Sequence, residues 1–97
     1  MDADLLMARL SGSDFSGADL SGADLEAAEF QGANLAGARL AETNLTDTDF
    51  TDCNWWRALG LSAETLERLR KEFPPGANTK AGLKRDFENW LKGADLR

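Results

Sequence analysis

The sequence predicts a mainly β solenoid followed by two short helices, and three observations support this. Residues 3–57 divide without a gap into eleven blocks of five residues, each with a small residue first and a large apolar residue third. A period of five fits neither a helix nor a strand, so each block is expected to make one step of a repeating coil. Glycine recurs at the end of the blocks, and the period stops after Trp55-Trp56, where helical spacing begins.

The eleven block centres are all apolar, and we expect them to form the buried core of the solenoid. The fifth position is glycine in five blocks, and glycine readily adopts the backbone angles of a tight corner. Each block is therefore predicted to be a short extended side followed by a corner. The predicted core residues are Leu5, Leu10, Phe15, Leu20, Leu25, Phe30, Leu35, Leu40, Leu45, Phe50 and Trp55.

This pattern closely resembles that of the pentapeptide repeat proteins, over residues 3–57. The resemblance implies a right-handed quadrilateral β-helix with four blocks, or 20 residues, in each coil, and hence just under three coils here. A 20-residue offset stacks only apolar centres on one another, as in the column of Leu10, Phe30 and Phe50. The small first-position residues also point inward in this family, where they leave room beside the large centres.

Two amphipathic helices are predicted after the solenoid, over residues 61–73 and about 79–92. Ser62 is a favourable N-cap for the first helix, and Pro74-Pro75-Gly76 ends it. The second helix has its apolar residues on one face, namely Leu83, Phe87, Trp90 and Leu91.

The chain therefore divides into a repeat domain, residues 1–57, and a helical tail, residues 58–97. The last coil of a solenoid exposes unpaired backbone groups and an apolar cross-section, and the two helices are predicted to cap it. The alternative role is dimerisation, which helices in this position serve in some pentapeptide repeat proteins. Residues 93–97 resemble the start of another repeat, through chance, through a longer repeat protein, or through pairing with another chain.

A homodimer is predicted, with two candidate interfaces. At the N-terminal end, apolar residues occupy positions that normally point outward, which leaves apolar surface exposed. In the tail, the apolar face of the second helix could serve another subunit instead of the cap. The candidate interface residues are Leu6, Met7, Phe87, Trp90 and Leu91.

The net charge of −6 is unevenly distributed along the 97 residues. Residues 1–57 carry eleven acidic and three basic residues, a net charge of −8, and residues 58–97 carry six and eight, a net charge of +2. An acidic repeat surface argues against direct nucleic-acid binding and permits binding to a basic protein surface. No apolar run is long enough to span a membrane, and the N-terminus lacks a signal segment, so a cytoplasmic protein is expected.

The sequence offers little for catalysis or cofactor binding. It contains no histidine, and its single cysteine, Cys53, holds a small first position that predicts a buried structural residue. Carboxylates such as Asp4 and Asp24 could lie close on neighbouring coils, but a flat wall provides no pocket for them. The acidic run over residues 47–54 lacks the glycine and glutamate of a helix-loop-helix calcium site. We expect no enzyme activity, cofactor, metal or small-molecule substrate.

The favoured function is a non-enzymatic structural scaffold or protein-binding module whose partner the sequence does not identify. The resemblance implies an alternative, because some pentapeptide repeat proteins mimic DNA and modulate type II topoisomerases, by inhibiting gyrase or protecting it from quinolones. Three coils about 4.8 Å apart would make a short rod. Such a rod would copy only about eight phosphates of B-DNA, which favours the scaffold.

Overall fold

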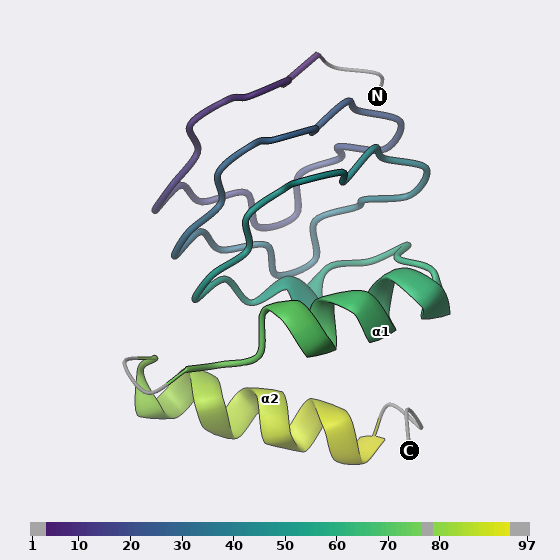
Figure 1. Cartoon of the computed structure of the whole chain (residues 1–97). Coiled ribbons are helices and arrows are strands. Elements are labelled where there is room, and N and C mark those ends of the chain that lie inside the picture. Colours follow the sequence, from purple (N-terminus) through teal and green to yellow (C-terminus); the bar gives the residue numbers. More distant parts are fainter. Residues whose placement is uncertain (1–3, 77–78, 94–97) are drawn as a thin grey trace.

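The computed structural model describes residues 4–76 and 79–93, and residues 94–97 of the repeat-like C-terminal segment lie outside them. The repeat segment winds into a stack of coils, and two helices lie across its C-terminal end (Figure 1). The elements are a short 3₁₀ helix η1 (Trp55–Arg57) and the helices α1 (Ala63–Glu72) and α2 (Ala81–Gly93).

Parallel bridges join residues that are twenty positions apart, from Asp4 with Asp24 to Arg39 with Leu59. This confirms the predicted 20-residue offset, so that four blocks complete one coil. The bridge to Leu59 extends the coil pattern two residues beyond the predicted end at residue 57.

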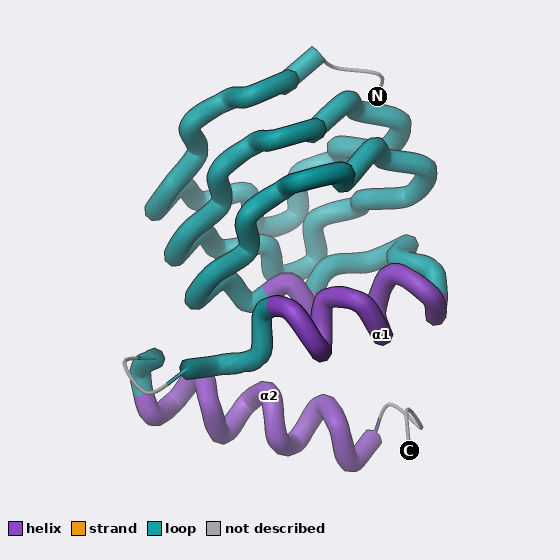
Figure 2. The backbone as a smooth tube through the Cα atoms, in the orientation of Figure 1, coloured by secondary structure: helices purple, strands orange, loops and turns teal. Residues whose placement is uncertain are grey.

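Within the described residues, each of the first ten blocks contributes one bridged residue and no continuous strand (Figure 2). The reason is that a two-residue turn follows the centre of each of these blocks, which leaves too short an extended side for a ladder. Backbone hydrogen bonds nevertheless join the coils. Glu29 donates its amide to the Ala8 carbonyl at 2.9 Å, and its own carbonyl accepts from the Leu10 amide at 2.7 Å.

The corners place the fifth residue of the block in the left-handed region of backbone space, as the glycines predict. Gly32, for example, has a φ of 70°. Five corners nevertheless carry a residue with a side chain at a φ of 57–59°, where a Cβ atom crowds the following carbonyl. These residues are Met7, Ala27, Glu42, Asp47 and Asp52.

Replacing Glu42 with glycine is expected to stabilise the fold by about 0.5–1 kcal/mol, because relief of left-handed strain exceeds the entropic cost of glycine. Glu42 is exposed and has a φ of 58°, so little else changes. The matched control is Gly32→Ala, which has open space for a methyl group and should destabilise by about 1 kcal/mol. Urea unfolding measures both, and a destabilised Glu42→Gly variant would refute corner strain.

The core lies along the axis of the stack and is densest in its second and third coils. The block centres from Leu20 to Trp55 are buried, with exposed fractions of 0–8%. The prediction that all eleven centres are buried is wrong for the first coil, whose Leu5, Leu10 and Phe15 are half-buried. The reason is that, within the described residues, no coil packs on their other side.

The two helices cover the last coil, as the cap interpretation predicted. Trp55 is fully buried, donates its indole N–H to the Phe73 carbonyl at 2.9 Å, and packs edge-on against Phe87 and Trp90. The predicted N-cap is confirmed, because the Ser62 hydroxyl accepts from the Thr65 amide. Among the described residues, no helix has the length and apolar character needed to cross a membrane.

Candidate interaction surfaces

The edge of the first coil that faces away from the second coil carries backbone groups with no partner in the described residues. In the second coil, Glu29, Asn34 and Arg39 each direct both the amide and the carbonyl to the coil before them. Their counterparts twenty residues earlier have the same backbone orientation but, among the described residues, make no backbone hydrogen bond with these groups. We call these counterparts, Arg9, Asp14 and Asp19, the first-coil edge.

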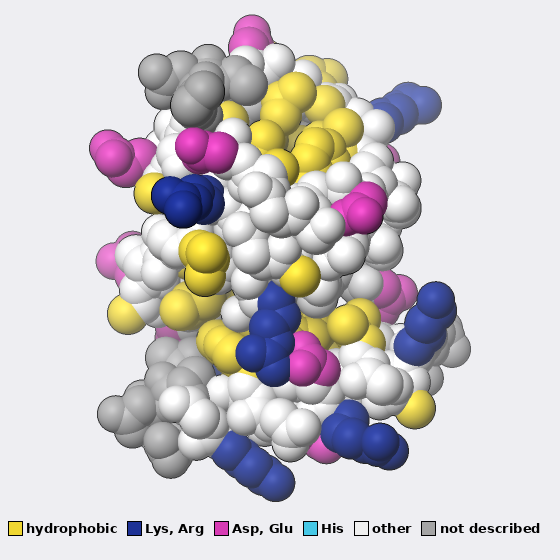
Figure 3. All heavy atoms as spheres, turned by 180° about the vertical axis from the view of Figure 1, so that it is seen from behind, with side chains coloured by type: hydrophobic (Ala, Val, Ile, Leu, Met, Phe, Trp, Pro, Cys, Tyr) yellow, Lys and Arg dark blue, Asp and Glu magenta, His cyan; other side chains and the backbone are white. Residues whose placement is uncertain are grey.

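Apolar side chains lie beside the first-coil edge. Leu6 and Met7 are 48% and 67% exposed, as their outward positions predicted. Behind them are the three half-buried centres of the first coil. Figure 3 shows hydrophobic side chains gathered at this end of the stack. In the described part of the chain, the N-terminal end therefore combines unpaired backbone groups with apolar surface.

The tail residues predicted as an alternative interface are used within the chain. Phe87 is buried, and its ring centre lies 5.0 Å from that of Trp56 and 5.9 Å from that of Trp90. Leu91 is half-buried and packs against the same core cluster. These three residues cover the last coil, so the structure provides a use for them that needs no second subunit.

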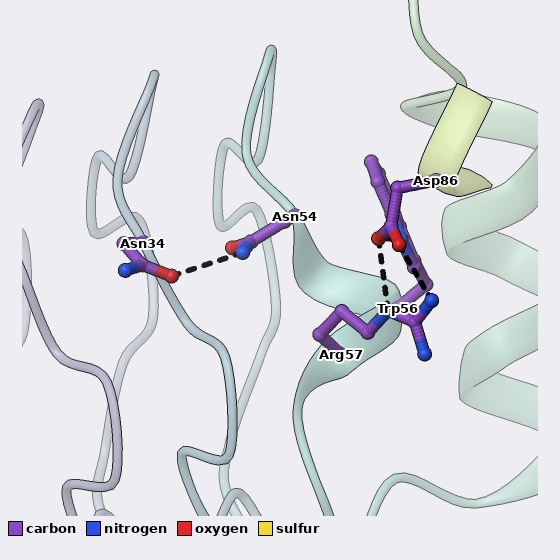
Figure 4. Close-up of polar contacts among 5 residues, drawn as sticks. All are labelled: Asn34, Asn54, Trp56, Arg57 and Asp86. Atoms are coloured by element: carbon purple, nitrogen blue, oxygen red, sulfur yellow. Dashed lines mark hydrogen bonds and ion pairs between the residues drawn. The ribbon is translucent and has the colours of Figure 1, made fainter. Parts of the chain in front are cut away.

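A polar clamp fastens α2 to the end of the stack. Arg57 donates from Nε and from a terminal nitrogen to the two carboxylate oxygens of Asp86, at 2.8 and 2.6 Å, and Trp56 donates its indole N–H to the same carboxylate at 2.8 Å (Figure 4). The hydrogen bonds from Arg57, with a smaller contribution from Trp56, hold the pKa of Asp86 below its usual value. The sequence analysis missed this clamp, because its partners are 29 and 30 positions apart.

Replacing Asp86 with asparagine should lower stability by about 1 kcal/mol at neutral pH, a figure discounted for the partial exposure of the pair. Because the folded pKa is depressed, the stabilisation is present above the unfolded pKa of Asp and is lost as the pH falls through the folded pKa. The parent should therefore lose more stability than the variant on acidification below about pH 4. Thermal melts test this, with the exposed Glu88→Gln as a control; parallel curves would contradict the clamp.

Where the last coil ends and η1 begins, the Asn54 side chain accepts a hydrogen bond that a backbone carbonyl accepts elsewhere in the coils. Its carbonyl accepts from the Arg57 amide at 3.0 Å, so its side-chain oxygen accepts instead from the Leu35 amide, at 2.7 Å. Its side-chain nitrogen donates to the Asn34 side chain at 2.9 Å (Figure 4). The sequence signal for this role was an asparagine at the second block position immediately before two tryptophans.

The second residue of the block also has a structural role, which the sequence analysis did not predict. The Asp14 carboxylate accepts from the Ser16 amide at 2.9 Å, and the Asp19 carboxylate accepts from the Ser21 amide at 3.0 Å. These are Asx turns, a pattern that the recurring Asp and Asn could have indicated. Hydrogen bonds from the side chain and amide of Ser16 lower the pKa of Asp14, and those from Ser21 lower the pKa of Asp19. Fixed, ionised carboxylates therefore line parts of the walls.

The described residues assemble no catalytic or metal-binding constellation. No group of three or more acidic, cysteine or histidine side chains among them could hold a metal ion. Cys53 is buried, as predicted, and burial raises the pKa of its thiol to about 12. A hollow of about 660 Å³ lies between the wall and the start of α2, where Asn34, Asp52 and Lys80 contribute to its lining. Thr79 also lines the hollow, and its buried hydroxyl accepts from the Gly76 amide at 2.8 Å and donates to the Asp52 carboxylate at 2.6 Å. These hydrogen bonds hold the segment between α1 and α2 against the wall.

Comparison with known proteins gives one family match and one structural likeness to report. The family model of pentapeptide repeats matches residues 18–57 in eight copies. Among solved structures, the chain is similar to a pentapeptide repeat protein from the thylakoid lumen of Arabidopsis thaliana, with 26% identity and a TM-score of 0.47, over 95% of this chain and 66% of that one. No curated protein matches the chain significantly. Residues 18–57 are therefore pentapeptide repeats, and the family resemblance seen in the sequence is confirmed.

Proposed function

We propose that the protein is a non-enzymatic protein-binding scaffold that holds its partner at the N-terminal end of the stack. The observation that carries the proposal is the difference between the two ends. Helices cover the last coil, whereas the backbone groups of the first-coil edge, beside the exposed Leu6 and Met7, make no backbone hydrogen bond within residues 4–76 and 79–93. A partner that adds an extended segment there would pair the backbone and cover the apolar side chains.

The family resemblance supports a finer description of this scaffold. Pentapeptide repeats typically form a right-handed quadrilateral β-helix, and the 20-residue bridges fit four steps in each coil. In such a coil the binding surface is the open cross-section of the β-helix. A partner would then meet the ends of the apolar columns rather than a cleft.

Capture from a lysate of the source organism tests the location of the binding surface. The immobilised parent is compared with Leu6→Glu/Met7→Lys at the N-terminal end and with Arg85→Glu/Lys92→Glu, whose positions on α2 are exposed. Proteins identified by mass spectrometry should bind to the parent and to the α2 variant but not to the N-terminal variant. Equal capture by all three proteins, or loss only with the α2 variant, would reject this surface.

A second candidate function is modulation of a type II topoisomerase by DNA mimicry. The observation that favours it is the set of wall carboxylates held in place by Asx turns, among them Asp14, Asp19 and Asp24. The longest extent of the molecule, 33 Å, matches only about ten base pairs of B-DNA. Adding the protein to a gyrase supercoiling assay, with and without a quinolone, tests this candidate, which an unchanged assay would reject.

A further inference from the structure

We propose that one side of the last coil binds an extended, basic peptide segment of a partner protein. This site is separate from the N-terminal surface proposed above. Leu59 pairs with Arg39 of the second coil, and its carbonyl accepts from the Leu40 amide at 2.8 Å. Gly60 then turns the chain away at a φ of 87°, and the chain enters α1 (Figure 1). The side of the third coil that holds Asn44 therefore receives no fourth coil.

Three backbone groups on the Asn44 side have no partner. In the second coil, the Leu25 amide donates to the Asn44 carbonyl at 3.0 Å, and the equivalent groups on either side of it also bond to the third coil. Their counterparts twenty positions later are the Thr43 carbonyl and the Leu45 and Asp47 amides. Within residues 4–76 and 79–93, these three groups make no hydrogen bond.

A groove of about 560 Å³ gives access to this side of the coil. One wall consists of residues 40–46, which include Thr43 and Leu45, and the other includes Ser62, Thr65 and Arg68 at the start of α1. Arg68 donates a terminal nitrogen to the Leu45 carbonyl at 3.0 Å, whereas its Nε is buried and makes no hydrogen bond. Buried donors normally have acceptors, so an occupant that offers carbonyl oxygens would satisfy groups on both walls.

The spacing of the three backbone groups fits an extended chain that runs parallel to the coil. A residue placed beneath Asn44 would donate its amide to the Thr43 carbonyl and accept at its own carbonyl from the Leu45 amide. The carbonyl two residues later would accept from the Asp47 amide. These are the hydrogen bonds that a fourth coil would make. A segment of about six residues is long enough to span this side of the coil from corner to corner.

The charges around the groove select a basic segment. Glu42 and Asp47 are the corner residues at the two ends of the Asn44 side, and both are exposed. The basic residue that lines the groove, Arg68, already has a carboxylate oxygen of Glu72 within 3.8 Å of its Nε. Lysine or arginine side chains at the two ends of a bound segment would therefore meet unlike charges.

Titration of the ¹⁵N-labelled protein with a synthetic peptide tests the site. The probe is the hexapeptide Lys-Thr-Val-Thr-Val-Lys with both ends capped, and it should shift the amide resonances of Leu45 and Asp47 with a dissociation constant of some hundreds of micromolar. N-methylation of its two central residues removes backbone donors and should weaken binding at least about ten-fold. Replacing both lysines with glutamate should weaken binding by a similar factor.

Protein variants locate the bound peptide. Thr65→Phe fills the groove from the side of α1 and keeps the amide that donates to Ser62, so it should abolish binding. Glu42→Lys reverses one corner charge and should weaken binding about five-fold. The matched control is Glu88→Lys at an exposed position of α2, which should bind the peptide like the parent. If circular dichroism shows that Thr65→Phe is unfolded, Glu42→Lys and the modified peptides still decide.

The contrary outcomes are distinct from those of the proposed function. Equal binding of the N-methylated peptide would overturn strand pairing, and equal binding of the glutamate peptide would overturn the charge selection. Shifts confined to the first coil, or binding that survives in folded Thr65→Phe, would place the peptide elsewhere and reject the groove. A parent that binds no peptide at millimolar concentration overturns the site, while the capture experiment on the Leu6 and Met7 surface decides the proposed function separately.

Discussion

Replacing Leu35 with aspartate is expected to prevent cooperative folding or to cost at least about 4 kcal/mol. Leu35 is fully buried in the core cluster, and its column continues to Trp55, which is also fully buried. A carboxylate there would lose its hydration without gaining a partner. Urea unfolding followed by circular dichroism measures the loss.

The matched control for this variant is Asn34→Asp, which introduces the same group one residue earlier on the exposed side of the coil. Its side-chain oxygens can still accept from the Ala36 amide and from Asn54. The control should change stability by less than about 1 kcal/mol. A Leu35→Asp variant that unfolds at the same denaturant concentration as the parent would show that the inward face is assigned wrongly.

Replacing Trp55 with alanine is the second change with a large expected effect, a loss of about 3–5 kcal/mol. The indole is fully buried between the last coil and the cap, where its ring centre lies 5.5 Å from that of Trp90. The variant also leaves the Phe73 carbonyl without its donor. We expect α2 to separate from the stack, which would raise proteolysis in the segment that joins the helices and increase the binding of a hydrophobic dye.

Trp55→Phe is the comparison that separates packing from the hydrogen bond. It keeps an aromatic ring in the pocket but loses the indole donor, so its cost should be smaller than that of the alanine variant. Equal losses in the two variants would assign the effect to the hydrogen bond. A stable Trp55→Ala protein with intact helices would contradict the cap itself.

The repeat segment was predictable because its determinants are local and periodic. Each block carries a small residue, an apolar centre and a turn, so the side chains that point inward follow from the period alone. The helix that begins after Ser62 was predictable for the same reason, since an N-cap acts within a few residues. The family resemblance supplied the 20-residue coil, which the bridges bear out.

The left-handed corners at Ala27 and Glu42 were not predictable from residue type, because neither residue favours that region. Those corners are imposed by the coils above and below, whose bridges hold the turns in register. The half-buried state of Leu10 also followed from its position in the stack, although its block matches those deeper in the core.

The sequence by itself determined the five-residue step, the inward face and the existence of two helices, because each depends on contacts between near neighbours or on a repeated interval. The tertiary structure alone decided how the two ends differ. Asp86 clamps Arg57, and Asn54 replaces a backbone carbonyl, through contacts between residues 29 and 19 positions apart that no period specifies. The first-coil edge emerged in the same way, since whether a backbone group is paired depends on the coil beside it and not on the residue that carries it.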